Sequence, residues 1–110
     1  MKIKISIYAY YGKYEGGSLD DYVIVEDTRE GRLGFLLDTT YTNEEEELED
    51  FEWEDNVTDF LDGKIDEITY RNEGDWDDPT AYTFKITTYE DELKELENKI
   101  EKLKKEFGVE

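Results

Sequence analysis

KIKISIYAYY, residues 2–11, alternates apolar and polar side chains along its whole length. The apolar residues occupy every second position, at Ile3, Ile5, Ile7 and Ala9. A period of two is typical of a strand that buries one face and exposes the other. The stretch therefore predicts a half-buried strand at the start of the chain and, with it, a β-sheet.

Four further segments have the composition of strands, and turn-forming residues separate them. We expect these strands at residues 21–27, 33–38, 65–71 and 81–88. The first two should continue the opening strand as a meander, with TREGR as the turn between them. The last two should form a hairpin that places three side chains on one face, at Tyr82, Phe84 and Ile86.

Two helices complete the predicted fold. Thr42 and Glu45 have the spacing of a capping box, which predicts an acidic helix from about Asn43 into the mid-50s. A short turn near Asn56 should then bring apolar side chains to the core, at Val57, Phe60 and Leu61.

The second helix has the stronger pattern. Thr87 and Glu90 repeat the capping-box spacing, and Gly108 fits a C-terminal stop. Between them the apolar residues follow spacings of 4, 3, 4, 3 and 4, at Tyr89, Leu93, Leu96, Ile100, Leu103 and Phe107. This stripe could pack on the sheet of its own domain or form a homodimeric coiled coil, although fewer than three heptads are marginal alone.

Together the elements predict one α+β domain over residues 1–110, in the order β-β-β-α-β-β-α. We expect an antiparallel five-stranded sheet, with the long C-terminal helix packed on one face and the acidic helix exposed. A chain of 110 residues has room for a single modest core.

The composition excludes several functions. The chain has no Cys and no His, so thiolate metal sites, cysteine nucleophiles and Ser-His triads are excluded. Nothing singles out two of the 32 carboxylates as an acid–base pair. No apolar run approaches the roughly 20 residues that span a bilayer. We expect a soluble, non-enzymatic protein without cofactors or membrane contact, in the cytoplasm of a bacterial host cell.

The net charge of −19 is concentrated in the middle of the chain. Residues 14–84 carry 24 acids and four cations, whereas residues 85–110 carry eight acids and six Lys. The densest part is residues 42–63, with eleven carboxylates and no Lys or Arg. Such a charge distribution repels nucleic acid and anionic membranes and attracts basic surfaces.

The two predicted helices use charge in opposite ways. The C-terminal helix spaces Glu and Lys at i, i+4, which stabilises a helix by about 0.2–0.5 kcal/mol per pair. The acidic helix would instead set Glu45 against Glu49 and Glu46 against Asp50, at a similar cost. Because this charge opposes local folding, we infer that it serves a partner outside the chain.

A nucleic-acid-binding protein offers the complementary surface. Duplex DNA carries one negative charge per roughly 1.7 Å of axis, and carboxylates on a helix can approach that density. We therefore predict a mimic of nucleic acid, whose main patch comprises Glu44, Glu45, Glu46, Glu47, Glu49, Asp50, Glu52, Glu54 and Asp55. Its margin comprises Asp59, Asp62, Asp75, Asp77 and Asp78. Two aromatic anchors are expected at Trp53 and Trp76, unless both rings cap the core instead.

In composition, through runs such as NEEEELEDFEWED (residues 43–55), the chain resembles the small acidic phage and mobile-element inhibitors that block CRISPR effectors or restriction enzymes. YGKYEGGSLDDYV, residues 11–23, is similar to the opening of ArdA-type antirestriction proteins. The chain departs from ArdA-type proteins in being shorter and in ending on a coiled-coil-like helix. The resemblance implies a stoichiometric inhibitor that occupies the nucleic-acid channel of its target and does not itself bind nucleic acid.

Three alternatives compete with this interpretation. Calcium binding is disfavoured because DNVTDFLDGKIDE, residues 55–67, places Val57 where an EF-hand needs an oxygen ligand. The NEGDWDDPT segment could hold Ca²⁺ loosely, although Asp-rich hairpin loops are more often solvated turns. Halophilic adaptation is disfavoured because ten of the 13 cations are Lys. The remaining alternative is an interaction or assembly protein that dimerises through its C-terminal helix.

Overall fold

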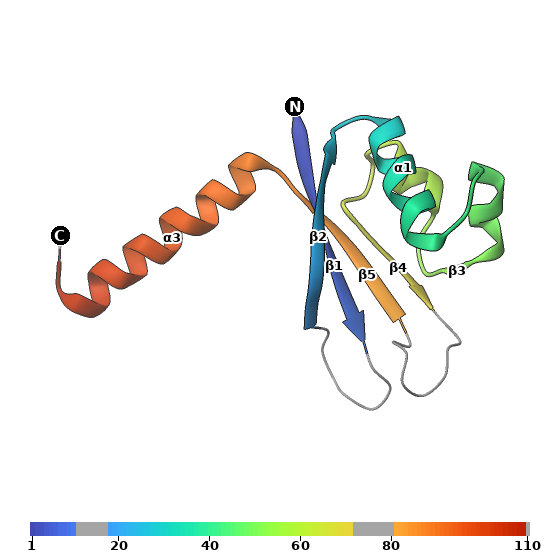
Figure 1. Ribbon diagram of the computed structural model, residues 1–110. Coiled ribbons are helices and arrows are strands. Elements are labelled where there is room, and N and C mark those ends of the chain that lie inside the picture. Colours follow the sequence, from blue (N-terminus) through green and yellow to red (C-terminus); the bar gives the residue numbers. More distant parts are fainter. Residues whose placement is uncertain (11–17, 72–80, 110) are drawn as a thin grey trace.

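The structure is a computed structural model and describes residues 1–10, 18–71 and 81–109. The order of elements differs from the predicted one, although the class is α+β as expected (Figure 1). The elements are, in order, β1 (Lys2–Tyr10), β2 (Ser18–Glu26), α1 (Arg29–Thr40), the 3-10 helix η1 (Glu45–Asp50), β3 (Glu52–Trp53), α2 (Val57–Leu61), β4 (Glu67–Arg71), β5 (Ala81–Thr87) and α3 (Tyr89–Phe107).

The sheet has five antiparallel strands in the order β2-β1-β5-β4-β3, which confirms the predicted sheet. β1 pairs with both β2 and β5, so its alternating pattern is buried on one face. Ile3 and Ile5 are 2% and 0% exposed. The predicted pairing of the last two strands is confirmed as well, with β4 beside β5 and Phe84 fully buried.

One predicted strand is wrong. Residues 33–38 lie in α1, where Phe35 and Leu36 face the core. The Thr40 hydroxyl donates a hydrogen bond to the Leu36 carbonyl one turn earlier. A short apolar run fits a strand or a buried helix face equally well, and here the N-cap settles the outcome. The Thr28 hydroxyl accepts a hydrogen bond from the Gly31 N–H at 3.0 Å and starts the helix.

The core lies between one face of the sheet and the layer formed by α1, η1 and α2. Phe35 of α1 meets Phe84 of β5 edge to face, with ring centroids 5.1 Å apart. Phe60 and Leu61 reach the same core from α2, which confirms the predicted turn after Asn56. The Asn56 side chain caps that short helix by accepting from the Thr58 N–H.

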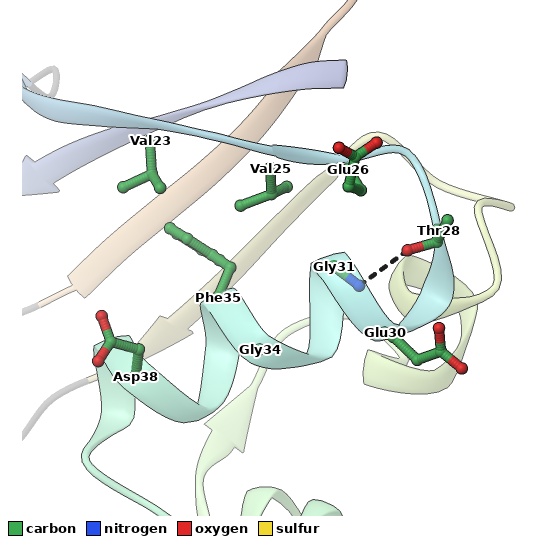
Figure 2. Close-up of a pocket in the computed structure, with 9 residues that line it drawn as sticks. All are labelled: Val23, Val25, Glu26, Thr28, Glu30, Gly31, Gly34, Phe35 and Asp38. Atoms are coloured by element: carbon green, nitrogen blue, oxygen red, sulfur yellow. Dashed lines mark hydrogen bonds between the residues drawn. The ribbon is translucent and has the colours of Figure 1, made fainter. Parts of the chain in front are cut away.

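An apolar groove of about 540 Å³ separates part of α1 from β2 (Figure 2). Val23 and Val25 of β2 point across it toward Phe35 of α1. The helix and strand converge at Gly31, whose backbone lies against the last residue of β2, Glu26. The absence of a side chain at Gly31 therefore permits the close approach of α1 to the sheet.

The predicted packing of α3 on the sheet is wrong. The helix projects away from the sheet (Figure 1), and no residue of α3 is buried. Its start is fixed by a capping box one residue later than expected, between Thr88 and Asp91. Two residues of the sheet contact the first turn of α3 at Glu92. Lys4 forms an ion pair with the Glu92 carboxylate at 3.1 Å, and the Thr87 hydroxyl donates a hydrogen bond to it.

The face of the sheet opposite the core carries both polar and apolar side chains. β1 and β5 present Lys4, Ser6 and Lys85 there, and the exposed Tyr22 and Ile24 of β2 lie beside Ser6 and Lys4 on the same face. The predicted stop at Gly108 is confirmed, with φ of 65°. Across the described ranges, no helix combines the length and apolar character needed to cross a membrane.

Candidate partner-binding surface

The acidic segment is a 3-10 helix and not the predicted α-helix. A 3-10 helix has three residues per turn, so side chains three apart lie on one ridge. Glu45, Leu48 and Phe51 form the ridge that faces the protein, and Leu48 is fully buried. The remaining residues of η1 therefore point outward.

Pairing of the following strand explains why the α-helix does not form. The chain must become extended after Asp50, because β3 pairs with β4 through Glu52–Arg71 and Trp53–Tyr70. The predicted N-cap at Thr42 is also wrong, because η1 begins after Glu44. The Thr42 hydroxyl instead forms a hydrogen bond with the Thr40 hydroxyl.

The two outward ridges of η1 are almost entirely acidic. One continues from Glu46 through Glu49 toward Glu52, and the other from Glu44 through Glu47 to Asp50. At about 2.0 Å rise per residue, η1 carries its four outward carboxylates at roughly one per 3 Å. One DNA strand carries a phosphate per about 3.4 Å of axis. The segment thus approaches the linear charge density of a single strand.

One arginine ties this segment to its neighbours. Arg29, the first residue of α1, binds both carboxylate oxygens of Glu45 at 2.6 and 3.1 Å. Its Nε donates to Asp62, which follows α2, at 3.1 Å. These hydrogen bonds lower the pKa of Glu45 below its ordinary value and raise the pKa of Arg29. A single guanidinium therefore holds α1, η1 and α2 together.

A second arginine reduces the predicted patch further. Arg71 of β4 contacts Glu54 at 2.9 Å. Three predicted patch residues, Glu45, Glu54 and Asp62, thus have cationic partners within the chain, which corrects the expectation that the patch is unbalanced throughout. Sequence inspection of residues 42–63 missed these pairs because both arginines lie outside that range and arrive only through the tertiary fold.

Eight predicted patch residues form no ion pair with any of the described residues, and we call them the acidic face. They are Glu44, Glu46, Glu47, Glu49, Asp50, Glu52, Asp55 and Asp59. All eight lie in η1, its N-cap, β3, α2 or the turn between β3 and α2. Asp75, Trp76, Asp77 and Asp78 lie outside the described residues.

Trp53 packs on the core from the edge strand β3. Its indole N–H donates to the Leu48 carbonyl at 2.7 Å, and its ring lies 5.1 Å from that of Tyr70. Phe51 meets Tyr70 edge to face at 5.9 Å. The ring of Trp53 therefore anchors β3 and η1, which agrees with the core-capping alternative.

Burial of Tyr70 predicts a loss of stability in alkali. The Tyr70 side chain is stacked 5.4 Å from Tyr82, and burial raises its pKa to about 12. The unfolded chain would ionise this phenol near pH 10, so the contribution of Tyr70 is complete below pH 10 and is lost as pH rises toward 12. We expect a loss of about 2 kcal/mol in the free energy of unfolding across that range.

The measurement is urea unfolding at a series of pH values from neutral to alkaline. Tyr70→Phe is the control, because it keeps the ring packing and removes the ionisable group. The variant should lose less stability than the parent chain over the same pH range, and equal losses would contradict the assignment to Tyr70.

Comparison of the chain with models of protein families, with curated proteins and with solved structures finds no match.

Proposed function

We propose that the chain is a stoichiometric inhibitor that mimics nucleic acid and occupies the basic nucleic-acid-binding channel of a bacterial defence nuclease, such as a CRISPR effector or a restriction enzyme. The observation that carries the proposal is the acidic face, whose eight carboxylates have no cationic partner among the described residues. The chain uses arginines to pair neighbouring acids, so the remaining charge is available to a basic surface.

Rigidity of the segment supports the proposal. Leu48 is fully buried, Glu45 is fixed by Arg29, and the backbone carbonyl of Leu48 is held by Trp53. The outward carboxylates of η1 therefore project from an anchored backbone. A preorganised array loses less conformational entropy on binding than a flexible acidic tail would.

The proposed inhibitor acts without chemistry of its own. It would work in the cytoplasm of a bacterial cell and compete with DNA or RNA for the same cations of its target. Association should be fast at low ionic strength and should weaken steeply as salt is added, because steering by exposed charges is screened.

The test is competition binding to purified CRISPR effectors and restriction enzymes, chosen by affinity capture from bacterial lysates. The parent chain should be displaced by the nucleic acid that the enzyme binds. The triple variant Glu46→Gln, Glu49→Gln and Glu52→Gln removes one outward ridge and should weaken binding about 10- to 100-fold, with a shallower salt dependence.

A matched control removes the same charge from a distant exposed surface. Glu90→Gln, Glu95→Gln and Glu101→Gln on α3 changes the net charge equally and should leave binding within a few-fold of the parent. An enzyme that binds this chain and its nucleic acid at the same time would sink the proposal. Equal weakening by the two triple variants would show that net charge, and not the acidic face, is recognised.

A further inference from the structure

The apolar side chains of α3 are uncovered. Their exposure ranges from 40% at Leu93 to 76% at Phe107, and no residue of the helix is buried. They form one stripe with coiled-coil spacing, at Tyr89, Leu93, Leu96, Ile100, Leu103 and Phe107. A continuous apolar stripe on a projecting helix marks a contact surface for another molecule.

Charged residues border the stripe on both sides. In heptad terms, Leu93, Ile100 and Phe107 occupy position a, and Tyr89, Leu96 and Leu103 occupy position d. One border, position e, then holds Glu90, Glu97 and Lys104. The other border, position g, holds Glu92, Lys99 and Glu106. The signs of these charges constrain how a second identical helix can lie against the first.

A parallel pair is disfavoured by its charges. In parallel helices, position g faces position e of the following heptad on the other copy. Glu92 would then face Glu97, and Lys99 would face Lys104. Every bordering contact in that arrangement joins like charges. A parallel pair would also bring both acidic domains to the same end of the assembly. These domains would repel each other, because each whole chain has a net charge of −19.

One antiparallel register pairs opposite charges at every bordering contact within its overlap. In antiparallel helices, position e faces e and position g faces g. When Leu96 lies opposite Phe107 of the other copy and Ile100 lies opposite its Leu103, Glu97 faces Lys104. In the same register Lys99 faces Glu106, and symmetry repeats both pairs. All four bordering contacts join opposite charges.

Other antiparallel registers lack this match. Full overlap of the helices, with Tyr89 opposite Phe107, sets Glu92 against Glu106 and Lys99 against Lys99. The matched register instead overlaps the C-terminal halves of the helices. Each domain then lies at its own end of the pair, separated by the helical segment that includes Tyr89 and Leu93.

We propose that a second copy of this chain covers the C-terminal half of the α3 stripe, in an antiparallel pair that sets Leu96 against Phe107 and Ile100 against Leu103. The contact is independent of the acidic face, which lies on other elements of the fold. An inhibitor of this form would present two acidic faces on one particle.

The experiment is sedimentation equilibrium of the full chain at about 0.15 M salt, over micromolar to millimolar concentrations. The parent should dimerise reversibly. Lys99→Glu should weaken the dimer about tenfold, because it turns two attractive contacts into repulsive ones. Adding Glu106→Lys to this variant should restore the parent affinity by reversing both signs.

Two further variants complete the test. Lys105→Glu makes the same charge change on the outer side of the helix and should leave the dimer unchanged. Leu96→Gln with Ile100→Gln should abolish it, while Trp fluorescence shows that the domain remains folded, since neither side chain touches the core. A parent that stays monomeric over the whole range would overturn the proposal, as would a tighter dimer with Lys99→Glu, which indicates parallel helices.

Discussion

Gly31→Ala is expected to destabilise the fold by about 1–3 kcal/mol. A Cβ atom at this position would overlap the carbonyl oxygen of Glu26 and lie 3.1 Å from its carbonyl carbon. These are backbone atoms at the end of β2, and only Asp27 and Thr28 connect that strand to α1. The helix therefore cannot retreat from the strand without breaking its N-cap or the end of the β1–β2 ladder.

The same helix provides the control for Gly31. A Cβ atom at Gly34 meets nothing within 4 Å, so Gly34→Ala should be neutral or stabilise the fold by up to about 1 kcal/mol through helix propensity. Urea unfolding followed by tryptophan fluorescence measures both variants. Equal stability of the two would contradict the close approach of α1 to β2.

Leu48→Ala is expected to cost about 2–5 kcal/mol, the range for truncation of a fully buried leucine. Leu48 is the buried residue of η1, and its carbonyl accepts the Trp53 indole N–H. Loss of the side chain should therefore loosen the backbone that carries the acidic face. We expect weaker binding to the proposed target in addition to lower stability.

Glu49→Ala is the matched control for Leu48, because it truncates the next side chain along the same segment on the exposed side. Its free energy of unfolding should stay within about 0.5 kcal/mol of the parent. Amide hydrogen exchange at Glu45–Asp50 would report local loosening directly. Unchanged exchange in Leu48→Ala would show that other contacts hold the segment in place.

The strands with regular alternation could be predicted from the sequence. Ile3 and Ile5 in β1, and Phe84 and Ile86 in β5, recur with a period of two and are all buried on one face. Local pattern is sufficient there because the buried face of a strand is set by its own side chains. The capped ends of α3 were similarly predictable, to within one residue at Thr88.

Elements that depend on distant contacts could not be predicted. The apolar run at Phe35 and Leu36 fits a strand or a helix, and the Thr28 N-cap together with packing against β2 and Phe84 of β5 selects the helix. The acidic segment has helical composition, yet pairing of Trp53 with Tyr70 imposes an extended backbone on its end. Propensity is a weak preference that such tertiary contacts override.

The exposure of the acidic segment could be predicted from the sequence, and its charge balance could not. Eight carboxylates of the predicted patch are unpaired within the described residues, and Glu45, Glu54 and Asp62 are neutralised by arginines. Arg29 is 16 residues from Glu45 and 33 from Asp62 in sequence, so no local spacing rule connects them. The pairing follows from the docking of α1 on η1 and α2.

The three contacts of Arg29 limit which substitutions the protein can tolerate. Two oxygens of Glu45 and one of Asp62 are met by separate nitrogens of one planar group, a geometry that the single ammonium of lysine cannot reproduce. Of the outward acids on η1, only Glu47 forms a hydrogen bond within the described residues, accepting from the Asn43 N–H at 3.1 Å. Glu46, Glu49 and Asp50 can therefore change without loss of an ion pair or hydrogen bond among the described residues, whereas lysine at position 29 would lose part of the contacts of Arg29.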